Sequence, residues 1–182
     1  MTETVYAKRV VDFKNIKRPE LVIEKRDLTV GIYEEGFAEA TVEGGYIVLD
    51  FGKEMCGGVR IITGWIDNAE KFVTVRIRFG ESVAECCSSI GEKNATNDHS
   101  PRDFQVMVPG LSDLSFGMSG FRFARLELLS EKPVYIRNVY GVNTLPAFER
   151  EGTVKTSDAL LNRIIDTAAY TLKLNLQNGY MW

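Results

Sequence analysis

The sequence predicts a mainly β protein, namely an antiparallel β-sandwich followed by one long C-terminal α-helix. Apolar and polar residues alternate with period two over Phe72–Phe79 and Phe121–Leu129, as expected of strands with one buried face. Other short apolar runs are separated by glycine and proline, which favour turns. After residue 142 the apolar residues recur with helical spacing instead. Many strands followed by a single helix indicate a β-sandwich followed by the first part of a further structural unit.

Composition excludes several classes of partner. The chain has 182 residues, enough for one well-buried core, with 45% hydrophobic and 26% charged residues. Its net charge of −3 disfavours nucleic acid, because phosphate binding requires clustered cations. No apolar run approaches the roughly 20 residues that cross a bilayer. We therefore expect no nucleic acid and no membrane among the partners.

The N-terminus and the cysteines bear on the cellular compartment. The first residues lack the apolar segment of a signal peptide. The three cysteines, Cys56, Cys86 and Cys87, have no spacing typical of a disulfide framework, which suits a reducing compartment. We expect a cytoplasmic protein, or an exported one from which the signal has been removed.

Residues 1–45 are interpreted as an N-terminal extension with edge strands. Leu21–Ile32 contains strand-like pieces among charged residues after Pro19, and Ala38–Val42 is a further short strand before the Gly44-Gly45 turn.

The sandwich domain is predicted over residues 46–150 and is organised around Tyr46–Ile62. Two apolar runs, Tyr46–Phe51 and Val59–Ile62, are joined by a glycine-rich segment that supplies a turn or bulges. We predict two strands here, the second continuing to Ile66, with Asp50 at their corner. A carboxylate inside an apolar run must be paired, hydrogen-bonded or turned to solvent.

The rest of the sandwich follows from alternation and turn signals. In Phe72–Phe79 we expect Val73, Val75, Ile77 and Phe79 to share the buried face. The polar stretch Ser82–Arg102 is predicted to be a long loop. Three further strands are expected, at Phe104–Val108, Phe121–Leu129 and Val134–Val142.

Residues 151–182 are interpreted as a linker and a helix over Ser157–Asn178. Ser157 or Thr156 is expected to cap the helix, and Asn178-Gly179 to end it. One face carries an apolar stripe, consisting of Leu161, Ile164, Ile165, Ala168, Leu172 and Leu176. Such a stripe requires a partner, so we expect it to fold back on the sandwich or to pair with another copy as a homo-oligomer, with fraying near Tyr180–Trp182.

No catalytic constellation emerges from the residues. The single histidine, His99, does not suffice for a histidine-based zinc site or a Ser-His-Asp triad, and we expect neither metal nor cofactor. Cys86 and Cys87 would point to opposite sides of a strand, which favours packing over redox chemistry. Several acids are available for glycoside hydrolysis, but no spacing selects a pair. We assign structural roles to Asp50, Glu81, Asp103 and Arg122, with Arg122 expected to pair with Glu81 or Asp50.

Several ordered motifs nevertheless carry a resemblance. They are LDFGKEMCGGVRI (Leu49–Ile61), VRIRFGES (Val75–Ser82), the Asp103-Phe104 strand, GFRFARLE (Gly120–Glu127) and SDALLNRII (Ser157–Ile165). Together they resemble the bacterial α-L-rhamnosidases of glycoside hydrolase family 78, over roughly Tyr46–Trp182. That family often has bulkier residues after the glycines, and Tyr in place of Phe123.

The resemblance implies both a fold and a function. In the family a jelly-roll sandwich of concanavalin-like type precedes an (α/α)6 catalytic barrel, so the helix would be the first of a truncated barrel. The catalytic acids lie on that barrel, beyond the motifs matched here, and none is carried over to this chain. The chain would be a non-catalytic scaffold, and the full-length enzyme would hydrolyse terminal α-L-rhamnose from glycosides with inversion.

An alternative is a carbohydrate-binding module without hydrolase activity. Sandwiches of this kind bind sugars through exposed aromatic side chains. The candidates here are Trp65, Tyr46, Tyr135 and Tyr140.

Overall fold

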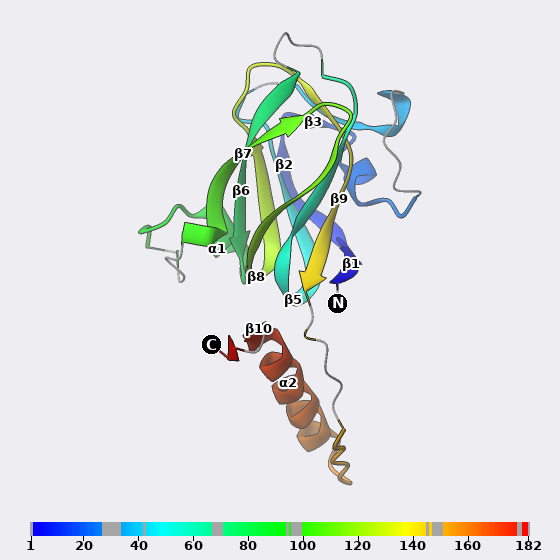
Figure 1. Cartoon of the computed structure of the whole chain (residues 1–182), viewed down its shortest axis with the longest axis vertical. Helices are drawn as coiled ribbons and strands as arrows, with labels where there is room; N and C mark the ends of the chain where they lie inside the picture. The colour runs from blue at the N-terminus through cyan, green and yellow to red at the C-terminus, as the bar shows by residue number, and fades with distance from the viewer. Residues whose placement is uncertain are drawn as a thin grey trace.

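The computed structural model describes residues 2–26, 34–41, 43–66, 71–93, 95, 100–144, 146, 151–177 and 180–181. It confirms the predicted fold class, because a mainly antiparallel β-sandwich is followed by one long helix, α2 (Figure 1). The strands are β1 (Thr2–Tyr6), β2 (Arg9–Lys14), β3 (Ile16–Lys17), β4 (Ala38–Ala40), β5 (Tyr46–Thr63), β6 (Phe72–Gly80), β7 (Asp103–Pro109), β8 (Asp113–Leu128), β9 (Val134–Thr144), β10 (Leu176–Gln177) and β11 (Tyr180–Met181). The α-helices are α1 (Val83–Cys87) and α2 (Ala159–Asn175), and the 3₁₀ turns are η1 (Pro19–Ile23), η2 (Glu34–Gly36) and η3 (Ser100–Arg102).

Two long strands, β5 and β8, connect the two layers of the sandwich. They pair antiparallel from Tyr46 opposite Glu127 to Ile62 opposite Asp113. The first half of β5 has β2 on its other edge, and β6 and β7 extend this first layer beyond β8. The second half of β5 has β9 on its other edge, and β4 and β3 extend the second layer. The β5–β8 ribbon therefore bends from one layer into the other.

The structure corrects the prediction for Tyr46–Ile62. One continuous strand, β5, replaces the two strands expected, and it ends at Thr63 rather than Ile66. Its pairing with β8 is interrupted by register shifts between Asp50 and Met55 and between Gly57 and Val59. Gly52, with φ 90°, lies in the first irregularity, where glycine tolerates the left-handed backbone. The glycines thus bend the strand through bulges and do not reverse the chain.

The core lies between the layers and follows the predicted alternation in β6. Val73, Val75, Ile77 and Phe79 are buried in it, as expected. In β8 the prediction fails at one point, because the period-two alternation over Phe121–Leu129 would place Phe121 and Phe123 on the same face. Phe121 lies in the main core, where its ring stacks on that of Phe79 with the ring centres 4.2 Å apart. Phe123 packs instead in a small cluster with Val48 and Cys86. The irregularity in the β5–β8 pairing separates Phe121 from Phe123 and changes the face between them.

The remaining β predictions differ in detail. The expected strands at Phe104–Val108 and Val134–Val142 lie within β7 and β9. The strand-like interpretation of Leu21–Ile32 is wrong for its described part, where η1 begins at Pro19, a residue suited to the first turn of a helix. The predicted loop Ser82–Arg102 contains α1 and η3. The predicted strand at Ala38–Val42 is present as β4, while Val42 and His99 lie outside the described residues.

Helix α2 is shorter than predicted and is capped by a different residue. The Asp158 carboxylate accepts hydrogen bonds from the backbone N–H groups of Leu160 and Leu161, so Asp158 is the N-cap instead of Ser157 or Thr156. The helix ends at Asn175, and β10 then pairs with β11. Tyr180–Met181, where fraying was expected, lies in this pair, and the predicted end at Asn178-Gly179 is outside the described residues.

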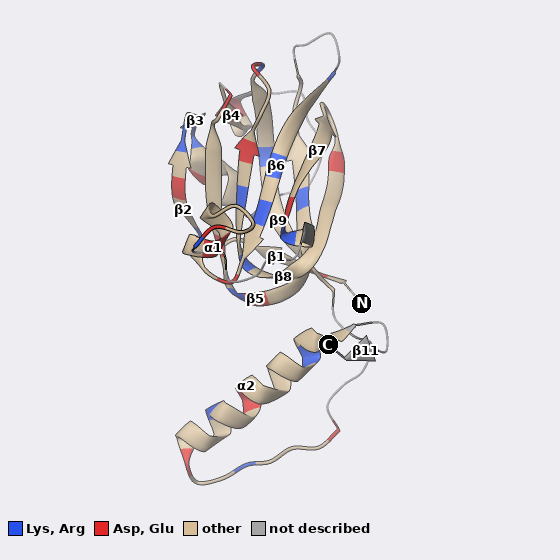
Figure 2. Ribbon diagram, turned by 90° about the vertical axis from the view of Figure 1, so that its left-hand side faces the viewer, with Lys and Arg blue, Asp and Glu red and all other residues tan. Residues whose placement is uncertain are grey.

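The apolar stripe of α2 is exposed. The structure describes α2 throughout, and none of its residues is buried. The exposed fraction is 43% for Leu161, 55% for Ile164 and 49% for Leu172. The helix points away from the sandwich (Figures 1 and 2), so the expected folding back of the stripe onto the sandwich is wrong. In the described part of the chain, no helix has the length and hydropathy of a membrane span.

Candidate functional site

The pairing of β5 with β8 is irregular between Asp50 and Met55, and we call this segment the bend of β5. It holds a buried carboxylate that accepts hydrogen bonds from several donors. The Asp50 side chain is 3% exposed, and Arg122 binds both of its oxygens, Nε to Oδ1 at 2.8 Å and Nη2 to Oδ2 at 3.0 Å. Arg9 Nε and the backbone N–H of Gly52 also donate to Asp50, at 3.2 and 2.8 Å. The Arg122 hydrogen bonds, followed by those of Gly52 and Arg9, lower the pKa of Asp50 to about 2.

This geometry confirms the predicted pairing of Arg122 with Asp50. The other candidate partner, Glu81, is exposed at the end of β6. Its backbone N–H donates to the Glu85 carboxylate at 2.7 Å. The Asp103 carboxylate accepts two hydrogen bonds from Arg76, from Nε at 2.8 Å and from Nη2 at 2.7 Å.

Glu54 lies in the same bend and was not singled out from the sequence. Burial, followed by repulsion from Glu81 and Glu85, raises its pKa to about 8, against the attraction of Arg122. Its carboxyl is therefore largely protonated at neutral pH and can donate a hydrogen bond. No sequence signal identified Glu54, because the pKa shift depends first on burial in the folded chain and then on acids brought from the end of β6 and from α1.

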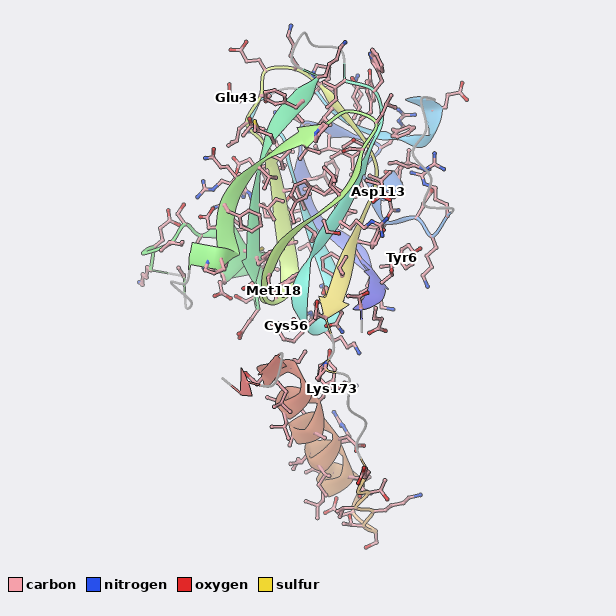
Figure 3. The ribbon with its side chains drawn as sticks, viewed as in Figure 1. Tyr6, Glu43, Cys56, Asp113, Met118 and Lys173 are labelled. Carbon is pink, nitrogen blue, oxygen red and sulfur yellow. The ribbon has the colours of Figure 1, made fainter. Side chains whose placement is uncertain are left out.

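The bend is also where the sandwich meets α2. The Tyr170 hydroxyl donates a hydrogen bond of 2.5 Å to the backbone oxygen of Glu54. The Lys53 ammonium lies 4.7 Å from the centre of the Tyr170 ring, within range of a cation–π interaction. Figure 3 shows Lys173, in the C-terminal half of α2, beneath the end of the sandwich that carries Cys56 and Met118. The bend therefore anchors the C-terminal half of α2.

A hollow of about 420 Å³ opens beside the bend. Its walls combine three lysines, Lys8, Lys25 and Lys53, with Tyr6 and Glu3. Lys25 also lies 5.7 Å from the centre of the Tyr6 ring. Ammonium groups beside an aromatic ring suit a ligand that has an apolar ring face and an acidic or strongly polar substituent. We refer to this feature as the lysine hollow.

The four aromatic candidates do not form one surface. Trp65 is 45% exposed in the segment after β5, with Lys71 Nζ 4.7 Å from its ring centre. The Tyr135 backbone lies next to the same segment, because its carbonyl oxygen accepts a hydrogen bond from the N–H of Gly64, the residue before Trp65, at 2.8 Å. The Arg125 Cζ atom lies 3.8 Å from the centre of the Tyr46 ring, and the Tyr46 hydroxyl donates a hydrogen bond to the Asp12 carboxylate. Tyr140 is fully buried beneath Arg60.

Neither metal ligation nor paired acid chemistry is evident in this part of the molecule. Among the described residues, no group of three His, Cys, Asp or Glu side chains is arranged to hold a metal ion. Asp50 is held by arginines and serves as an ionised structural group. Glu54 is the acid of the bend with proton-donating character.

Comparison with known proteins identifies the fold. No protein-family model matches the sequence, and no curated protein matches it. The structure is similar to a rhamnosidase from Klebsiella oxytoca solved with rhamnose bound, with a TM-score of 0.67 and 16% identity, over 97% of this chain and 36% of that one. It is also similar to a GH78 family rhamnosidase of Bacillus sp. GL1, with a TM-score of 0.55 and 19% identity, over 85% of this chain and 15% of that one.

Stand-alone modules share the sandwich as well. The CBM32 module of AlyQ, solved with 4,5-unsaturated mannuronic acid, has a TM-score of 0.50 and 16% identity, over 76% of this chain and 97% of the module. The chain thus spans about a third of the Klebsiella rhamnosidase, and less of the Bacillus one, but nearly all of the module. The sandwich is therefore of a type found both in rhamnosidases and in carbohydrate-binding modules.

Proposed function

We propose that this chain is the non-catalytic β-sandwich portion of an α-L-rhamnosidase-like glycoside hydrolase. In this proposal the sandwich built from β1 to β9 is one domain, and residues 151–182 form the linker and first helix of a catalytic (α/α)6 barrel. The carrying observation is the exposed apolar stripe of α2, a surface suited to packing against further helices. Similarity over 97% of the chain to the Klebsiella rhamnosidase extends into α2, whereas similarity to the module covers 76%.

The bend of β5 gives the scaffold its mechanical role. Arg122, Arg9 and Gly52 hold Asp50 and so fix the shape of the bend. Tyr170 and Lys53 then attach α2 to the bend. A helix held at one end, with its stripe free along its length, can be built into a helical barrel without disturbing the sandwich core.

The proposal predicts where hydrolysis resides. A longer polypeptide, in which barrel helices follow α2, should release the phenol from an aryl α-L-rhamnoside, whereas residues 1–182 should not. The reason is that the family resemblance implies catalytic acids on the barrel, which would follow α2, and carries none of them over to residues 1–182. Turnover measured on matched molar amounts of both proteins tests this. Activity of residues 1–182 that co-purifies with the protein and is lost on heating would overturn the proposal.

Direct sugar binding by the sandwich is the second candidate function, and the lysine hollow is the observation that favours it. Its Tyr6 ring and ammonium groups match a saccharide that has an acidic or densely hydroxylated face. The exposed Trp65, in the segment after β5, is the competing site.

Two matched substitutions separate these sites. If the hollow binds sugar, Tyr6→Ala should weaken binding of an acidic oligosaccharide by about tenfold or more, because an aromatic stacking contact is lost. Trp65→Ala should then leave the affinity unchanged. Calorimetric titration of the wild type and both variants provides the measurement. The reverse pattern would move the site to Trp65, and no binding by the wild type would exclude a module function for that ligand.

A further inference from the structure

Helix α1 brings the two adjacent cysteines together on the outer face of the first layer. Cys86 is fully buried against Val48 and Phe123, while Cys87 is partly exposed. Their sulfur atoms lie 4.0 Å apart. The sequence interpretation placed them on opposite sides of a strand, but in a helix successive side chains are only about 100° apart. Figure 2 shows α1 in front of this layer.

Two arginines from the sheet beneath converge on Cys87. Arg125 on β8 interacts with the Cys87 sulfur and lowers the pKa of Cys87, and Arg78 Nη1 on β6 donates a hydrogen bond to the Cys87 backbone oxygen at 3.1 Å. Arg78 is 5% exposed. The Nε atoms of both arginines are buried and have no hydrogen-bond partner in the described part of the chain. The site therefore holds positive charge and donor capacity beyond what its present partners use.

The surrounding groups set the charge balance of Cys87. The hydrogen bond from the Cys86 thiol, followed by Arg125 and Arg78, lowers the pKa of Cys87 to about 6, although burial opposes this. The pKa of Cys86 is raised by its contact with Cys87 and by burial, so Cys86 keeps its proton, for which the Cys87 sulfur and the Val83 backbone oxygen, 3.3 Å away, are both acceptors. Glu127 shares both arginines, at 3.1 and 3.4 Å, and Tyr46, bound to Asp12, faces the site from β5.

We propose that Cys87 is a nucleophilic thiolate that exchanges with small-molecule disulfides carrying carboxylate groups. The Cys87 sulfur attacks one sulfur of the disulfide, a protein–ligand S–S bond forms, and the original S–S bond breaks. The departing thiolate takes the electron pair, so Cys87 is oxidised while half of the disulfide is reduced, with no other oxidant. Arg125 and Arg78 attract the carboxylates. Cys86 is a positioning residue, because its thiol stabilises the Cys87 thiolate.

Reaction of the native chain with 5,5′-dithiobis(2-nitrobenzoic acid), an anionic aromatic disulfide, tests the proposal. We expect one rapid release of thionitrobenzoate per chain, with the adduct on Cys87 by peptide mass spectrometry. The rapid phase should have a pH midpoint near 6. It should vanish in Cys87→Ser and persist in Cys56→Ser, the matched control at a buried cysteine. Cys86→Ala should keep the reaction but move its midpoint toward the ordinary thiol range of about 8.5.

A second comparison needs no variant and so does not depend on folding of an altered chain. Cystamine, a cationic disulfide, should react at least about tenfold more slowly than the anionic reagent, after each rate is divided by that of the chain unfolded in urea. A rapid phase that survives Cys87→Ser would overturn the proposal. So would a wild-type midpoint in the ordinary thiol range. Equal normalised rates for the two reagents would overturn the carboxylate preference.

Discussion

Replacing Asp50 with Ala is expected to lower the free energy of unfolding by about 2–3 kcal/mol, less than for most fully buried ion pairs, because the Arg122 side chain is 39% exposed. Asp50 is 3% exposed and accepts hydrogen bonds from Arg122, Arg9 and the Gly52 backbone. The substitution leaves the Gly52 backbone N–H and the Nε and Nη2 groups of Arg122 without their acceptor. Urea denaturation at pH 7 measures the loss. A loss below about 1 kcal/mol would mean that solvent replaces Asp50 readily.

Arg9→Ala is the matched control for this experiment. Its side chain is 65% exposed, although it contacts the same carboxylate at 3.2 Å. Exposed pairs are typically worth about 0–1 kcal/mol, because water competes for both partners. A small effect for Arg9 beside a large effect for Asp50 would locate the stabilisation in the Arg122 fork and the Gly52 bond. Equal losses would contradict this assignment.

The same residue sets an acid limit. The folded pKa of Asp50, about 2, lies below its ordinary value of 3.8, so ionised Asp50 stabilises the folded state. Its contribution is fully present above about pH 5 and is lost progressively as the pH falls toward 2. Asp50→Asn should be less stable than the wild type at pH 7 and should lack this part of the acid dependence. The difference between the two proteins should therefore shrink between pH 5 and 2.

The fold was predictable where one short pattern decides it. The alternation in β6 gave its buried face, because each residue needs only its neighbours to show which side faces the core. The bend of β5 was not predictable in the same way. Its glycines fit a turn or a bulge equally well, and the choice depends on β8 pairing with both halves of the strand. Long-range pairing of this kind leaves no local signature.

The sites follow the same division. Asp50 was identifiable because an acid within an apolar run requires a partner, and Arg122 on a nearby strand was a candidate. Glu54 was not, since its raised pKa depends first on burial in the folded chain and then on repulsion from Glu81 and Glu85. The Cys86–Cys87 contact was not either, since it depends on α1, which forms within a stretch predicted to be a loop. The helix was predictable from its period, whereas the exposure of its apolar stripe was not, because a stripe does not specify which surface will cover it.

At the stripe of α2 we expect self-association of residues 1–182. Leu161, Ile164 and Leu172 lie on one face and are 43–55% exposed. An apolar side chain of this size gains about 1.5–3 kcal/mol on full burial, so three from each copy give helix pairing a substantial driving force.

Replacing all three residues with Gln should therefore weaken association by at least about a thousandfold, because each 1.4 kcal/mol is a factor of ten. The helix itself should persist, since Gln is nearly as good a helix former as Leu, and circular dichroism checks this. Val154→Gln, at an exposed apolar residue outside the helix, is the matched control and should associate as the wild type does. Sedimentation velocity over a range of concentrations gives the measurement. A wild-type chain that stays monomeric at high concentration would show that the stripe has no affinity for itself, leaving the helices of a barrel as its proposed partner.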